Sequence, residues 1–117
     1  MTISRDDLNE LLNESFGEME PELFRLWDLI NVPPVMWRDH PWNNPCHGYW
    51  VVAVLGQLAI WYNDREDGFQ VNHFRIYGTL DEYGCQQDEL HHILWWLWKH
   101  IETGQPYGPW GHATKTD

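Results

Sequence analysis

The chain has 117 residues, a formal net charge of −11 and an aromatic fraction of 15% that includes nine tryptophans. This length suits one domain with its own core, and the charge disfavours binding to nucleic acid or to an anionic membrane, because like charges repel. The sequence has neither a cationic start followed by an apolar run nor a stretch of about 18 apolar residues, so we expect a cytoplasmic protein without a membrane span.

Residues 1–31 are predicted to form an acidic pair of helices. Ser4 is a suitable N-cap, Gly17 is a suitable end for the first helix, and Pro21 fits the first turn of the second. Apolar residues recur every three or four positions in both segments, which gives each helix one face to bury. The segment carries eight acidic residues and two arginines, a net charge of −6, so the remaining faces are strongly acidic.

Residues 32–48 contain four prolines and two tryptophans without a regular period. Pro33 and Pro34 cannot continue a helix, so we expect an extended connection whose apolar side chains lie against the rest of the domain. Connections of this length in compact domains are usually functional or disordered, and the aromatic residues argue against disorder.

An antiparallel sheet of three or four strands is predicted over residues 49–83. Two apolar runs of strand length flank Gly56 and Gln57, a two-residue loop with glycine first, which is typical of a β-hairpin. Both faces of this hairpin are apolar, so we expect cover on both faces, from helices or from another chain. The turn-like residues 64–68 then lead to a third strand within residues 69–83.

A helix is predicted over residues 85–104, with acidic residues in its first turn and a glycine at its end. Its apolar arc is wider than one buried face requires, and Trp95 and Trp96 widen that arc in both directions. Residues 105–117 are predicted to be an extended tail. If the tail leaves these two rings uncovered, we expect a homodimer that buries them, because twofold dimers are the commonest closed assembly.

Together these elements predict an α+β fold. The antiparallel sheet is centred on the hairpin, and the two N-terminal helices and the tryptophan-rich helix pack on it. Regular pairing in the hairpin places Val51 opposite Tyr62, since side chains alternate with a period of two. The predicted core residues are Val52, Val54, Ile60, Leu94, Leu97 and Ile101.

The sequence contains no recognised catalytic signature, metal-ligand spacing or cofactor motif, so we predict no catalytic residues, no metal and no cofactor. The position that would complete a helical histidine pair with His92 is Trp96. An enzyme with a cysteine and histidine site remains an alternative. Its site would have to use residues of the proline-rich connection and of the last helix's start: His40, Cys46, His47, Cys85 and His91.

The acidic residues and tryptophans favour a surface that docks a basic protein partner. Complementary charge accelerates the encounter, and aromatic side chains supply affinity when they lose water. The candidate partner-binding residues are Glu10, Glu14, Glu18, Asp64, Glu66, Asp67, Trp37 and Trp42.

Two other interpretations fit the same composition. A solvated acidic face without any partner explains the charge, and a carbohydrate or small-molecule cleft could use exposed Trp37, Trp42 or Trp110. In size, acidity and lack of a catalytic signature, the chain is similar to the small bacterial immunity and inhibitor proteins that neutralise basic toxins. This likeness implies a non-enzymatic protein that binds a basic partner.

Overall fold

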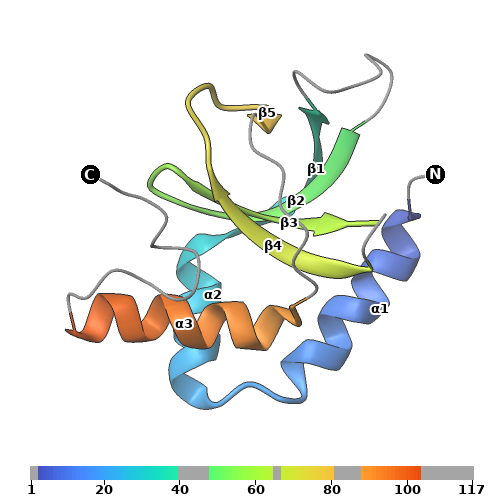
Figure 1. Ribbon diagram of the computed structural model, residues 1–117. Helices are drawn as coiled ribbons and strands as arrows, with labels where there is room; N and C mark the ends of the chain where they lie inside the picture. The colour runs from blue at the N-terminus through green and yellow to red at the C-terminus, as the bar shows by residue number, and fades with distance from the viewer. Residues whose placement is uncertain (1–2, 40–47, 65–66, 81–87, 104–117) are drawn as a thin grey trace.

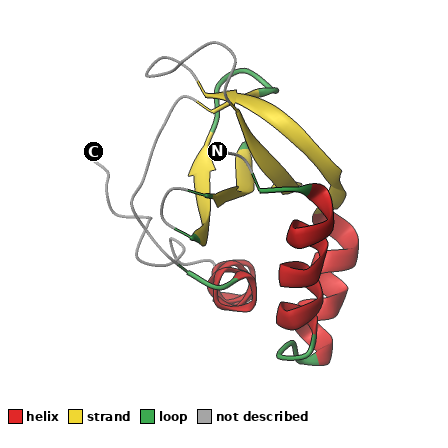
Figure 2. Ribbon diagram, turned by 90° about the vertical axis from the view of Figure 1, so that its right-hand side faces the viewer, coloured by secondary structure: helices red, strands yellow, loops and turns green. Residues whose placement is uncertain are grey.

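A computed structural model describes residues 3–39, 48–64, 67–80 and 88–103. The strands in these residues form one curled sheet of order β4-β3-β2-β1-β5, and the helices lie together on one side of it (Figures 1 and 2). The predicted α+β class is confirmed. The elements are α1 (Arg5–Phe16), α2 (Pro21–Ile30), β1 (Asn31–Asp39), β2 (Gly48–Leu55), β3 (Leu58–Asn63), β4 (Gly68–His73), β5 (Thr79–Leu80) and α3 (Leu90–Thr103).

The sheet differs from the predicted one in size and in strand direction. It has five strands rather than three or four, and it is mixed, because β1 pairs antiparallel with β2 but parallel with β5. The prediction that residues 32–48 form a connection is wrong in its first part, since β1 extends to Asp39. Residues 40–47 lie outside the described part of the chain. The predicted third strand is present as β4, and β5 adds a short strand at the opposite edge.

Pro33 and Pro34 lie inside β1 and interrupt its pairing with β2. Asn31 faces Ala53, and pairing resumes only where Val35 faces the residue two positions earlier in β2. The register shifts between these pairs because proline has no backbone N–H to donate to a neighbouring strand. A strand interrupted in this way has no regular period, which is why the sequence predicted a connection.

The predicted hairpin is present, with Gly56 and Gln57 as the loop between β2 and β3. Gly56 has a φ of +59°, a left-handed conformation that glycine adopts without strain and that is typical of the first position of primed turns. Every residue of β3 is buried, as expected for a strand with apolar side chains on both faces.

A β-bulge changes the register further along the hairpin. Between the regular part of the ladder and Val51, β2 carries the extra residue Val52, so Val51 pairs with Trp61. The predicted pair of Val51 with Tyr62 is therefore wrong. The shift turns Val52 and Ala53 toward the helices, while Val51 and Trp61 face the other side of the sheet.

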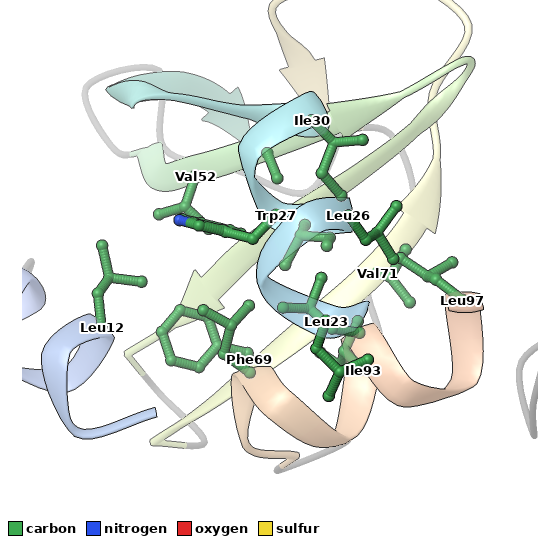
Figure 3. Packing of buried hydrophobic residues seen from close by; sticks show 14 of the residues in the cluster. Leu12, Leu23, Leu26, Trp27, Ile30, Val52, Phe69, Val71, Ile93 and Leu97 are labelled. Atoms are coloured by element: carbon green, nitrogen blue, oxygen red, sulfur yellow. The ribbon is translucent and has the colours of Figure 1, made fainter. Parts of the chain in front are cut away.

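The helix-facing side of the sheet holds the larger core, and Figure 3 shows residues of that core meeting from all three helices and the sheet. Leu12 comes from α1, Leu23 and Trp27 from α2, Leu97 from α3, and Val71 from β4. Burying one large apolar side chain contributes roughly 1.5 to 3 kcal/mol relative to leaving it exposed. This core therefore holds the helices against the sheet.

The opposite face of the sheet is buried under aromatic rings instead of helices. Trp37, Tyr49 and Trp61 are at most 2% exposed in a cluster to which no described helix contributes. Tyr49 and Trp61 have ring centroids 4.7 Å apart, and Phe74 packs edge-on against Trp37 at 5.0 Å. Among the described residues no helix covers this face, so the predicted helical cover is wrong there, and residues after β4 such as Phe74 pack on it instead.

The last helix begins at Leu90, later than predicted, and residues 81–87 lie outside the described part of the chain. Four of the six predicted core residues are buried: Val52, Ile60, Leu94 and Leu97. Val54 is half-buried, and Ile101 is 49% exposed, so its placement in the core was wrong. Ile101 lies in the last turn of α3, which projects beyond the sheet (Figure 1). Within the described residues, no helix combines the length and apolar character needed to cross a membrane.

Candidate functional site

A cleft of about 430 Å³ opens between α1, the start of β4 and the segment that leads into α3. Four carboxylates from three separate parts of the chain line it: Glu14, Asp67, Asp88 and Glu89. Two aromatic rings, a serine hydroxyl and a leucine side chain complete most of the lining. The cleft therefore combines a carboxylate rim with partly apolar walls.

The α1 wall of the cleft consists of Leu11, Glu14 and Ser15. These residues share one side of the helix because they are three and four positions apart. The predicted cap starts this helix, since the Ser4 hydroxyl accepts a hydrogen bond of 3.1 Å from the backbone N–H of Asp7. The wall thus lies on a helix with a well-defined first turn.

The residues around the start of α1 fix this helix against the sheet. The backbone N–H of Ile3 donates to Oδ2 of Asp64 at 2.8 Å, and its carbonyl accepts a bond of 2.7 Å from the indole N–H of Trp50. The guanidinium group of Arg5 donates to the carbonyl of Pro34 at 2.7 Å and lies 5.6 Å from the centre of the Trp50 ring. These bonds connect α1 to β1, to β2 and to the residue that follows β3.

The α3 wall is held by backbone bonds between Phe69 in β4 and Asp88. The N–H of Phe69 donates to the carbonyl of Asp88 at 2.8 Å, and a longer bond of 3.4 Å runs in the other direction. This bridge keeps the backbone at Asp88 extended, so Asp88 and Glu89 precede the helix instead of forming its first turn. Their carboxylates therefore line the cleft near β4.

Tyr62 and Phe69 form the aromatic part of the cleft, with ring centroids 5.1 Å apart. The Tyr62 hydroxyl donates to Oδ1 of Asp67 at 3.4 Å. Burial, followed by the charge of Asp67, its hydrogen bond and the charge of Asp64, raises the pKa of Tyr62 to about 12. Tyr62 therefore stays a neutral hydrogen-bond donor at physiological pH.

The cleft has a negative character because its described lining contains four carboxylates and no lysine or arginine. Among the lining residues that the structure describes there is no lysine, arginine or histidine, and none of the four carboxylates forms an ion pair with a described residue. The described ion pair between Lys99 and Glu102, at 3.3 Å, lies in the second half of α3. Like charges on a concave surface raise the local negative potential, which attracts cations.

A hydroxyl and an imidazole meet where α1 contacts α3. Nδ1 of His91 lies 3.5 Å from Oγ of Ser15, and Ser15 lines the cleft. His91 is half-buried, and its ring centroid is 4.4 Å from that of His92. His91 thus lies next to the cleft without forming part of its lining.

The chain was compared with protein families, curated proteins and solved structures. No family model, curated protein or solved structure matches the chain. Any functional conclusion therefore rests on the chemistry of the residues themselves.

The structure places two predicted partner-binding residues, Glu14 and Asp67, in the same cleft. Glu10 and Glu18 are exposed along and just after α1, outside the lining. Asp64 is half-buried and binds the backbone of the N-terminal segment through one carboxylate oxygen. Glu66 and Trp42 lie outside the described residues.

Trp37 does not provide the exposed ring that the carbohydrate alternative requires, because it is 2% exposed and packs against Phe74 in the aromatic cluster. Trp95 and Trp96 are 45% and 38% exposed, and their rings meet at 82°. Two rings at this angle do not form a flat platform for a sugar. The third candidate for sugar stacking, Trp110, lies outside the described residues, as Trp42 does.

Of the five residues proposed for a cysteine and histidine site, only His91 is described. His40, Cys46, His47 and Cys85 lie outside the described residues, so that alternative stays a prediction. In the residues that the structure describes, no group of three or more histidine, cysteine, aspartate or glutamate side chains is arranged to hold a metal ion.

Sequence reasoning missed the role of Asp88 and Glu89 because acidic residues before an apolar run usually mark the first turn of a helix. It also missed Tyr62, whose position in an apolar strand indicated only core packing. The useful signal was the acidic character of the first helix and of the segments that precede β4 and α3. What the sequence could not supply was the bridge between Phe69 and Asp88 that brings these segments together.

Proposed function

We propose that this chain is a non-enzymatic protein-binding module that docks a basic protein partner, in the manner of small immunity or inhibitor proteins. The observation that carries the proposal is the cleft lined by Glu14, Asp67, Asp88 and Glu89, with no lysine or arginine among the described lining residues. Carboxylates that share a cleft repel each other, and a cationic side chain relieves such repulsion when it enters.

The shape of the cleft supports a side chain as the element that enters. A volume of about 430 Å³ accommodates the end of a long side chain together with water, but it is small for a folded element. Leu11, Tyr62 and Phe69 offer apolar contact to the methylene groups of a lysine or an arginine, while the carboxylates contact its charged end. The exposed Glu10 and Glu18 extend the negative surface along α1 and steer the approach of the partner.

Charge reversal at the cleft tests this function. The double variant Glu14→Lys and Glu89→Lys changes two exposed residues of the lining. A matched control, Glu20→Lys and Asp28→Lys, makes the same change in net charge at exposed positions of α2 and its N-cap. All three proteins serve as bait in a native lysate at low and at high salt, after circular dichroism has confirmed their folding.

We expect the original chain and the control to retain the same basic protein at low salt, and the cleft variant to lose it. The purified complex should associate more slowly as salt rises, because salt screens the steering charges. Equal retention by the cleft variant would contradict docking at this site. Failure to retain any basic protein, together with turnover of a small molecule by the purified chain, would favour an enzyme instead.

A further inference from the structure

The contact between His91 and Ser15 places a titratable group beside the acidic cleft. Nδ1 of His91 lies 3.5 Å from Oγ of Ser15, a residue that lines the cleft, and the imidazole is half-buried. Histidine is the side chain whose charge ordinarily changes between pH 5 and pH 8. A positive charge at this position would lie next to the space that a cationic side chain occupies.

The charged groups that line the cleft beside His91 come from three parts of the molecule. On α1, Glu14 is adjacent to Ser15 in the sequence and lines the cleft. On its own segment, Asp88 and Glu89 precede His91, and the ring of His92 lies 4.4 Å away. Asp67, at the start of β4, lines the same cleft. The neutral imidazole leaves the potential of these four carboxylates intact, whereas the imidazolium offsets one of them.

We infer that His91 is a pH-sensitive regulator of the cleft, which lowers the affinity for a cationic partner when the ring becomes protonated. This inference rests on the proposed docking function and deepens it. A proton on His91 adds a positive charge beside the bound cation, and the contact with Ser15 then has Nδ1–H as the donor and the hydroxyl oxygen as the acceptor.

The test measures the affinity of the full chain for a nona-arginine peptide at pH 7.5 and at pH 5.5, at constant ionic strength, by isothermal titration calorimetry. The peptide keeps its charge over this range, because the guanidinium group of arginine stays protonated. The variant His91→Gln cannot titrate but keeps an amide that can bind Ser15. The variant His92→Gln removes the exposed neighbouring imidazole and serves as the matched control.

For the original chain and for His92→Gln, we expect binding to weaken by roughly three- to ten-fold on acidification, the effect of one added charge in a partly solvated site. For His91→Gln we expect less than about half of that change on a logarithmic scale. Equal pH dependence in the original chain and His91→Gln, or no pH dependence in the original chain, would overturn the inference while leaving the docking function intact. Absence of binding at both pH values would overturn the docking function, and the inference with it.

Discussion

Replacing Leu97 by alanine tests how α3 is anchored. Leu97 is fully buried in the core between α2, α3 and the sheet. The substitution removes three carbon groups, which costs about 2.4 kcal/mol at about 0.8 kcal/mol per group, and the cavity that remains adds about 1 to 2 kcal/mol. The free energy of unfolding should therefore fall by about 3 to 4.5 kcal/mol. For a chain of this length that corresponds to a decrease in melting temperature of about 12 to 18 °C.

Ile101, one helical turn after Leu97, provides the matched control because it is 49% exposed. Its replacement by alanine should cost less than about 1 kcal/mol, as expected for a side chain outside the core. Urea denaturation followed by circular dichroism gives both values. A cost below about 0.5 kcal/mol for Leu97→Ala, or equal costs at the two positions, would show that α3 does not pack as described.

Three further predictions concern the sheet and the cleft. Trp50→Phe removes the hydrogen bond to the Ile3 carbonyl and should lower the unfolding free energy in urea by about 1 kcal/mol, whereas an unchanged value would argue against this anchor. Gly48→Ala places a Cβ atom 2.5 Å from the carbonyl oxygen of Trp37. The free energy of unfolding, measured by thermal denaturation, should therefore fall by about 2 kcal/mol or more. An unchanged value would contradict the close approach of β1 and β2. The pKa of Tyr62 is raised from 10.0 to about 12 in the folded chain. Because the folded state holds this proton more tightly than the unfolded state, the shift stabilises the fold below pH 10, and this stabilisation is lost as the pH rises toward 12. Tyr62→Phe should therefore lose less stability than the original chain between pH 9 and pH 11, and identical losses would refute the shift.

The hairpin and the helices could be predicted because their signals are local. Ser4 caps α1, Pro21 starts α2, and Gly56 opens the hairpin loop, each through the conformation or hydrogen bond of a single residue. The fold class follows from these elements, since their apolar faces have to be buried against each other.

The rest of the sheet could not be predicted because it depends on contacts between distant segments. The strand β1 contains Pro33 and Pro34, which have no N–H to donate to a neighbouring strand. Its sequence therefore lacks the regular alternation by which a strand is recognised. The bulge at Val52 reverses the faces of the residues before it, and alternation alone does not indicate such a shift. Burial of Trp37 follows from the curl of the sheet, which the sequence of one strand does not show.

The candidate site was predictable in charge but not in position. The acidic character of α1 and of the residues after β3 is plain in the sequence, and Glu14 and Asp67 were candidates for that reason. The start of α3 joins them only because Asp88 bridges to Phe69 in β4. A cleft formed by three segments requires the tertiary structure, whereas its negative charge follows from composition.

The most direct measurement of the central claim is a chemical-shift map of the ¹⁵N-labelled chain during titration with nona-arginine peptide. Docking in the cleft predicts that the largest backbone amide shifts occur at Glu14, Ser15, Asp67, Asp88 and Glu89, which line it. The same shifts should be lost in the variant Glu14→Lys and Glu89→Lys. Shifts concentrated on the exposed side of α2, around Asp28, with the cleft amides unchanged, would show that the negative charge of this protein acts as a general surface and that the cleft is not its docking site.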